Sequence, residues 1–179
     1  MKTIKSIIAI VLLAAASCSC VKEKLQSEYN RQEDSIDKYI SSNLKDDRTV
    51  TYNGGSARLT LVKGEGEELQ PDGAIGFYYA GYTFKGSINA SGLFSTNHEA
   101  TAAAAKWNLT DPDYNLLEIN LNDARLLEGV RNGLIGVRAG EECEILFSGK
   151  YGFGNTTFGI IPANSALAFK IWVVSVSND

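Results

Sequence analysis

The chain has 179 residues, of which 44% are hydrophobic and 21% charged, and its formal net charge is −4. This composition is typical of a globular protein with a packed core, and the length predicts one domain with a tail. Because the charge balance is acidic and the sequence contains no basic run, we expect no nucleic-acid partner.

The N-terminal residues 1–17 have the order of a signal peptide. Lys2 and Lys5 precede a short apolar run, and small residues then lead to Cys18. The run is too short to span a membrane. A cysteine directly after small residues resembles the lipobox of bacterial lipoproteins. That resemblance implies cleavage before Cys18, acylation of its thiol, and anchorage in a lipid bilayer of the bacterial cell envelope, at the outer membrane or on the periplasmic face. An ordinary secretory peptide, or cleavage before Cys20, are the alternatives.

Cysteine usage excludes a fold held by disulfides. After cleavage, Cys20 would lie beside the anchor and Cys143 deep in the chain. Together they offer no even framework of spaced cysteines. The sequence also has no Cys-x-x-Cys motif and no Cys/His cluster, so we expect no metal ion and no cofactor.

Residues 18–50 differ in kind from the rest, since all 17 glycines lie at Gly54 or later. We interpret 18–50 as a tether with one amphipathic helix, docked on the domain or on a partner. A solvated spacer and a homodimer formed through this helix are open alternatives. The helix is predicted from apolar residues that recur at helical spacing amid charges, namely Leu25, Tyr29, Ile36, Tyr39, Ile40 and Leu44.

Over residues 51–179 the hydrophobic period changes from helical to two. Five alternating runs predict an antiparallel five-stranded sheet with one packed face; they cover 57–61, 75–79, 117–121, 143–147 and 167–173. One helix interrupts them, with Asp123 as its expected N-cap and an apolar stripe of Leu126, Leu127, Val130 and Leu134. The simplest α+β arrangement wraps the sheet over this short helix.

The sequence shows no pattern for acid–base or nucleophilic chemistry. His98 is the only histidine, and no nucleophile elbow accompanies it. Glu142 and Glu144 lie on the polar side of a predicted strand, where we expect solvated charges, and Cys143 alternates with core residues. A loop over 97–115 is long for a compact domain, and such loops are often functional.

Three segments of the second half carry a recognisable order. They are FYYAGYTFKG with GLFSTN, then LLEGVRNGLIGVRAGEECEILFSGKYGFG, then GIIPANSALAFKIWVVSV. Over 73–176, with an enlarged loop at 97–115, this order resembles the FKBP-type peptidyl-prolyl cis-trans isomerases. The resemblance implies an FKBP-like fold and isomerisation of proline-containing polypeptides, which would assist the folding of exported proteins. A non-catalytic, chaperone-like binding module of the same fold, anchored to the membrane, is the alternative.

The resemblance also implies a site made mainly of apolar groups. A twisted prolyl imide has lost its amide resonance and its charge separation, so an apolar cavity favours it over the planar ground state. The implied catalytic positions are Tyr79, Phe94, Ser95, Leu126, Leu127, Phe153, Ile161 and Phe169, and the implied substrate-binding positions are Leu117 and Val130. At Leu127 the family uses a backbone N–H at the helix start to bind a substrate carbonyl.

Four of these positions depart from the family pattern. Ser95 stands where the pattern has Asp, and Phe153 replaces a Tyr whose hydroxyl helps to hold substrate. Val130 stands where many members have Trp at the pocket floor, and Leu117 where an aromatic residue is usual. The sequence therefore predicts the fold together with reduced isomerase activity and reduced inhibitor binding.

Overall fold

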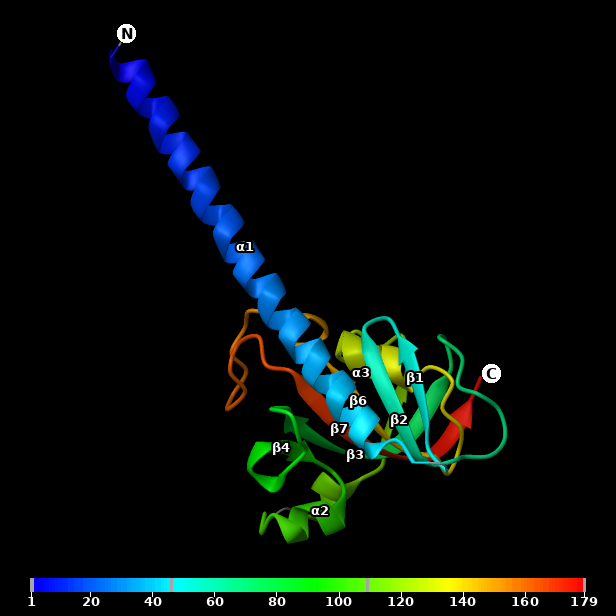
Figure 1. Ribbon diagram of the computed structural model, residues 1–179. Helices are drawn as coiled ribbons and strands as arrows, with labels where there is room; N and C mark the ends of the chain where they lie inside the picture. The colour runs from blue at the N-terminus through cyan, green and yellow to red at the C-terminus, as the bar shows by residue number, and fades with distance from the viewer. Residues whose placement is uncertain (1, 46, 109, 179) are drawn as a thin grey trace.

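The computed structural model describes residues 2–45, 47–108 and 110–178 (Figure 1). Side chains are described from residue 22 onward, except those of 46, 109, 111, 112 and 179. Cys18 and Cys20 therefore lie outside the residues whose side chains are described. Among the described residues, no helix is both long enough and apolar enough to cross a membrane.

The strands form one sheet in which every pairing is antiparallel. Its order is β1-β2-β6-β7-β3-β4, and β5 pairs with the end of β3 that β4 leaves free. The strands are β1 (Thr49–Asn53), β2 (Ser56–Val62), β3 (Ala74–Thr83), β4 (Leu93–Thr96), β5 (Leu117–Asn120), β6 (Glu142–Phe147) and β7 (Leu167–Ser177).

The sheet has seven strands, so the prediction of five was too low. The five expected runs correspond to β2, β3, β5, β6 and β7, and the missed strands are β1 and β4. β1 is largely exposed and β4 is only four residues long, so neither presents a clear alternation of buried and exposed residues. Both lie at the ends of the strand order. The antiparallel α+β fold class itself is confirmed.

Helix α3 (Glu128–Leu134) packs closely on β6 because glycines stand at its contact face. A Cβ atom on Gly129 would lie 2.2 Å from Cγ of Phe147, and one on Gly133 would lie 2.2 Å from Cγ2 of Ile145. A larger residue at either position would force the helix or the facing core side chain to shift. The expected N-cap was wrong, because Leu127 occupies that position; Asp123 instead closes the preceding turn by accepting from the Arg125 N–H.

The sheet is packed on both faces, not on one as the sequence predicted. On the α3 face, alternate residues of β6 and β7, such as Phe147 and Phe169, form the larger core with Val130 and Leu134. On the opposite face, Leu59 belongs to a second cluster that includes residues of α1; its buried members are Ile36, Ile40, Ala57, Leu59, Phe84, Leu146, Ala166 and Ala168. The two cores share strands but no side chains.

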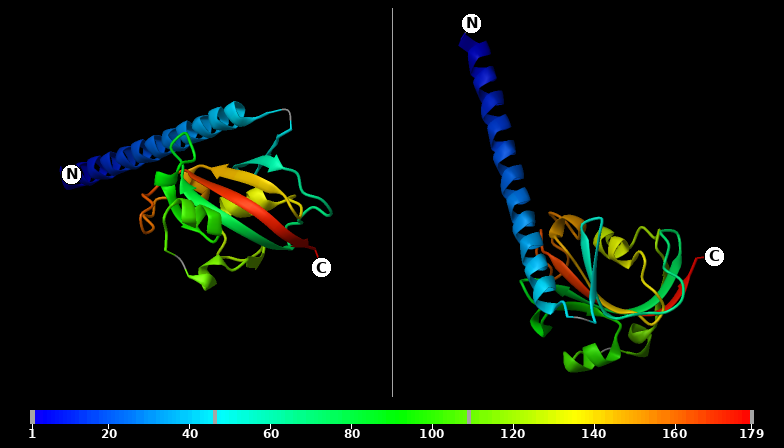
Figure 2. Two further views of the ribbon diagram at one scale, coloured as in Figure 1. Left: turned by 90° about the horizontal axis from the view of Figure 1, so that it is seen from below. Right: turned by 45° about the vertical axis from the view of Figure 1, so that its right-hand side comes forward.

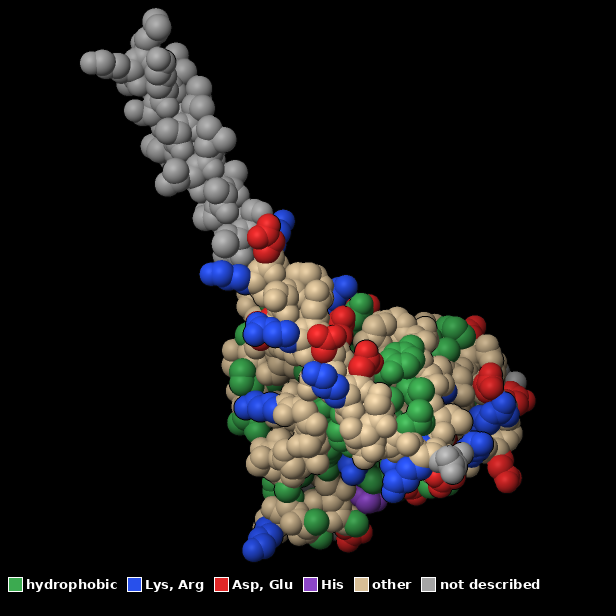
Figure 3. All heavy atoms as spheres, viewed as in Figure 1, with side chains coloured by type: hydrophobic (Ala, Val, Ile, Leu, Met, Phe, Trp, Pro, Cys, Tyr) green, Lys and Arg blue, Asp and Glu red, His purple; other side chains and the backbone are tan. Residues whose placement is uncertain are grey.

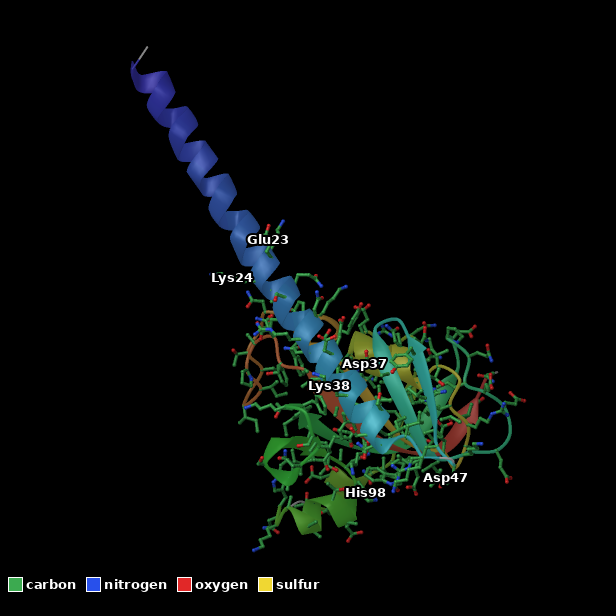
Figure 4. All side chains as sticks on the ribbon, viewed as in Figure 1. Glu23, Lys24, Asp37, Lys38, Asp47 and His98 are labelled. Carbon is green, nitrogen blue, oxygen red and sulfur yellow. The ribbon has the colours of Figure 1, made fainter. Side chains whose placement is uncertain are left out.

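Helix α1 (Lys2–Asn43) begins well before the expected 25–44, and Figures 1 and 2 show its N-terminal part extending away from the domain. Its C-terminal part lies on the sheet, where Ile36 and Ile40 are buried. The Tyr39 hydroxyl donates to Oε2 of Glu144 at 2.8 Å. In the structure the tether helix is thus docked on the domain. Its outer face carries charges of both signs (Figure 3), and Figure 4 labels Asp37 and Lys38 there.

The segment 97–115 folds into two short helical pieces, α2 (Glu99–Ala104) and η2 (Asp111–Tyr114). It packs beside β3, β4 and β7, where Trp107 lies against a third small cluster with Tyr82 and Leu93. Two further one-turn helices, η1 (Ala90–Gly92) and η3 (Gly149–Tyr151), complete the elements. This insertion therefore covers outer sheet surface that α1 leaves open.

Candidate functional site

A cavity of about 550 Å³ opens between the start of α3, the strands β3 and β4, and the segment after η3. We call residues 149–164 the site loop. All ten side chains implied by the family resemblance line this one cavity, which the sequence could place together only through that resemblance. The lining residues are Phe77, Tyr79, Phe94, Ser95, Leu117, Arg125, Leu126, Leu127, Val130, Phe153, Phe158, Gly159, Ile160, Ile161 and Phe169.

Aromatic rings pack around Phe169 at the base of the cavity. The Phe94 ring meets it edge-on, with the ring centroids 5.7 Å apart and the planes at 80°, and the Tyr79 centroid is 6.3 Å away. Behind it, Phe147 of the α3-face core stacks at 5.9 Å. Because each ring is held by another ring, the shape of the cavity is fixed by the core of the domain.

Few polar groups face this cavity. The hydroxyls of Tyr79 and Ser95 are hydrogen-bonded to each other at 2.9 Å. The Leu127 N–H has no acceptor among the described residues, so it is free to donate to a ligand carbonyl. No lining residue in the described chain carries a carboxylate, an imidazole or a thiol.

Arg125 is the one charged residue of the described lining, and its charge is already paired. Its guanidinium donates to both carboxylate oxygens of Asp123, at 3.0 Å from Nε and 2.6 Å from Nη2. Hydrogen bonds from Arg125 lower the pKa of Asp123 to about 2, so the pair stays ionised in the physiological range. An exposed, paired cation of this kind gives the rim little net charge.

The site loop forms an apolar wall at the mouth of the cavity. The Phe153 and Phe158 rings are stacked there, with centroids 4.6 Å apart and planes at 5°. Phe158 is 59% exposed and Ile160 is 77% exposed, which is unusual for residues of this size. A chain that enters the cavity would therefore meet apolar surface before it reaches the base.

Five lining residues were missed by the sequence analysis. Phe77 alternates with Tyr79 on β3, and this periodicity could have indicated it. The remaining four had no such signal, because Arg125 lies in a turn before α3 and residues 158–160 lie on an irregular part of the site loop. Their position in the cavity depends on how the loop folds back.

The other candidate reactive residues lie outside this cavity. His98 stacks on Trp172 at 3.8 Å beside α2, and burial lowers the pKa of its imidazole. Cys143 is buried in the core, where desolvation raises the pKa of its thiol. Glu144 is not solvated as expected, because it is buried on the α1 face and lies 3.4 Å from the Lys170 ammonium. These three residues therefore lie in packed or ion-paired surroundings and do not contribute to the cavity.

The fold is an antiparallel sheet wrapped over a short helix, and its aromatic cavity has no carboxylate, imidazole or thiol among the described lining residues. Such a lining suits an apolar or neutral group. The family model described as FKBP-type peptidyl-prolyl cis-trans isomerase matches residues 78–174, more than half of the chain. The chain belongs to this family.

Similar proteins span fungi, plants and bacteria. FK506-binding protein 1 of Aspergillus oryzae is 20% identical over 123 residues, covering 69% of this chain and 99% of that protein. The structure of FkpA from Escherichia coli is 15% identical with a TM-score of 0.56, covering 94% of this chain and 70% of that one.

Two further structures have the same fold. The peptidyl-prolyl cis-trans isomerase of Pseudomonas syringae is 15% identical with a TM-score of 0.57, covering 86% of this chain and 96% of that one. The three-domain structure of wheat FKBP73 is 19% identical with a TM-score of 0.57. It covers 74% of this chain, while this chain spans 52% of the wheat chain.

Proposed function

We propose that the cavity binds the prolyl ring of a polypeptide and catalyses rotation about the preceding imide bond. The observation that carries this proposal is an aromatic cavity on a rigid core whose described lining has no acid or base group. Prolyl rotation needs none, since its barrier of about 18–20 kcal/mol comes from lost amide resonance. A dry apolar site favours the twisted imide, in which charge separation is reduced.

The residues take distinct roles in this proposal. The rings of Phe94 and Phe169 hold the prolyl ring, and Ile161 and Val130 close the sides of the cavity. The free Leu127 N–H donates to a substrate carbonyl and fixes the chain relative to the imide. Leu117, Leu126 and Phe153 exclude water from the rim, while Tyr79 and Ser95 supply hydroxyl groups.

We expect modest activity because the polar complement of the cavity is small. The Tyr79 and Ser95 hydroxyls share one hydrogen bond, which leaves a single hydroxyl proton for a substrate, and Phe153 offers no hydroxyl. Each hydrogen bond not made to the substrate forgoes about 0.5–1.5 kcal/mol of stabilisation. A non-catalytic binding module, the second candidate function, would use the same apolar cavity for affinity alone.

An isomerisation assay separates these two functions. The full chain, purified in detergent, is tested on a proline tetrapeptide with and without a macrolide inhibitor of the family. We expect measurable acceleration that Phe94→Ala reduces and that Val62→Ala, which truncates an exposed side chain on β2, leaves unchanged. Peptide binding without acceleration, in a chain folded by circular dichroism, would support the binding module.

We further propose that the chain acts on exported proteins from the bacterial cell envelope, anchored through acylated Cys18. The support is the order of charged, apolar and small residues before that cysteine. Two or more acyl chains give stable anchorage where one would not. Mass spectrometry of the membrane fraction should find the acyl chains on Cys18, and Cys18→Ala should be released; an unchanged membrane pool would contradict the anchor.

From the apolar pattern of the tether helix we also propose a homodimer formed through this helix. The apolar residues Tyr29, Ile36 and Ile40 are buried in the single chain, so a dimer would have to use other surface of α1. Sedimentation of the full chain in detergent decides between monomer and dimer.

A further inference from the structure

The site loop is held at both ends by one turn of α1. Gln32 Oε1 accepts from the Gly149 N–H at 2.8 Å, at the first residue of the loop. Gln32 Nε2 donates to the Asn164 carbonyl at 2.7 Å, at its last residue. A single side chain from the tether helix thus connects the two stems of a loop that lies more than a hundred residues away in the sequence.

Neighbouring side chains of the same turn strengthen this connection. The Tyr29 hydroxyl donates to Oδ1 of Asn164 at 2.8 Å, and Ser148, just before the loop, donates to Oε1 of Glu33 at 3.1 Å. Figures 1 and 2 show the orange segment that contains the site loop beside α1 in each view. The contacts come from the described, C-terminal half of the helix.

The two stems of the site loop are in direct contact, and one of them holds an uncommon backbone conformation. A Cβ atom on Gly149 would lie 2.5 Å from the Asn164 carbonyl carbon, so the stems touch. Asn164 has a φ of 58°, in the left-handed region that non-glycine residues rarely adopt. Gly149 is buried, and its N–H would have no acceptor without Gln32. Inside the loop the Asn164 N–H donates to the Gly154 carbonyl at 2.6 Å, so Gln32 adds a second connection between the stems and supplies the acceptor for the Gly149 N–H.

We propose that Gln32 is a positioning residue for the candidate site, through which docking of the tether helix orders the apolar wall of the cavity. Between the two stems, the loop presents Phe153, Phe158, Ile160 and Ile161 to the cavity. When the stems separate, these side chains lose their common geometry and the cavity loses one wall. This inference rests on the proposed function only for its effect on substrate; the effect on loop order is independent of it.

The test is Gln32→Met in the full chain in detergent, which keeps the side-chain length and removes both hydrogen bonds. Gln26→Met is the matched control, because Gln26 is exposed on the same helix and its amide donates to Asn30. Amide hydrogen exchange of residues 149–164 should rise about tenfold in Gln32→Met, which corresponds to about 1.4 kcal/mol. Tyr29→Phe should act in the same direction with a smaller change.

A kinetic measurement distinguishes positioning from general loosening. In Gln32→Met fewer molecules have the binding-competent conformation. KM for the proline peptide should therefore rise about twofold or more, while kcat should change by less than about twofold. The melting temperature reports whether the whole domain is affected. Unchanged exchange at 149–164 overturns the inference, and raised exchange with unchanged KM overturns its link to the site. If the parent chain shows no isomerisation, the proposed function fails, and the exchange result alone still decides whether Gln32 orders the loop.

Discussion

The two faces of the sheet are packed with side chains of different size and polarity. The α3 face carries large apolar and aromatic side chains, including Phe77, Phe147 and Phe169, and continues directly into the cavity. The α1 face is packed with smaller residues, including several alanines, and contains the Tyr39–Glu144 hydrogen bond. The difference teaches that one face supplies the rigid base of the site, while the other face holds a helix in a defined position.

Strand β2 shows the contrast within a single element. Its apolar residues Ala57 and Leu59 face α1, whereas its polar residues turn toward α3. There the Ser56 hydroxyl donates to the Gly129 carbonyl, and the Arg58 guanidinium donates to the carbonyls of Gly133 and Ile135. Ala57 and Leu59 of β2 thus pack against the tether helix. Its polar residues hold α3 at both ends, Ser56 near the start and Arg58 at the C-terminal carbonyls.

The largest expected effect comes from truncation on the α3 face. Phe147→Ala should lower the free energy of unfolding by about 3–5 kcal/mol, since it removes a fully buried ring that stacks on Phe169 and touches Gly129. Urea unfolding followed by circular dichroism measures this change. A loss below about 1 kcal/mol would show that the α3-face core is not the main source of stability.

Truncation on the α1 face should cost less. Ile40→Ala should lower the free energy of unfolding by about 2–4 kcal/mol, as measured by the same urea unfolding, because the side chain is almost fully buried against β2 and β6.

A chain that starts at Thr49 should keep a cooperative melt at a lower temperature, as expected if residues 51–179 form the domain. If that shorter chain does not melt cooperatively, α1 is part of the folding unit and the boundary near residue 50 is wrong.

The Tyr39–Glu144 contact should make docking of α1 sensitive to alkaline pH. Burial raises the pKa of the Tyr39 phenol, and the Glu144 carboxylate raises it further. Because the pKa of the folded state lies above that of the unfolded state, the contribution is complete below about pH 10 and is lost as the pH rises beyond it. Tyr39→Phe should cost about 1.5–3 kcal/mol at neutral pH, since the acceptor is charged. Stability curves of the two proteins should converge above about pH 10; parallel curves would contradict this assignment.

The smallest effect concerns the polar rim of the cavity. Ser95→Asp with Phe153→Tyr adds polar groups with little change in volume, and Tyr79 lies 2.9 Å from the Ser95 oxygen, ready to donate to a carboxylate. We expect isomerisation to rise by a factor of several, because each added hydrogen bond contributes about 1 kcal/mol. The tetrapeptide assay measures it. No activity in either protein, with both folded, would favour the binding module.

Much of the fold follows from local patterns, and the errors have physical causes. The five predicted strands and the short helix exist, since alternation and a helical stripe record burial on one face. The number of packed faces was wrong, because the burial of Ala57 and Leu59 says nothing about which partner covers them. The prediction for Glu144 failed for the same reason, as its partners Tyr39 and Lys170 come from other elements.

The sequence by itself determined the alternating strands, the glycine positions that let α3 approach β6, and the apolar residues later found in the cavity. Only the tertiary structure decided that Gln32 of the tether helix meets Gly149 and Asn164, and that Phe158 and Ile160 reach the mouth of the cavity. The reason is that periodicity reports how deeply a residue is buried, whereas contacts between distant segments depend on how the chain closes in space.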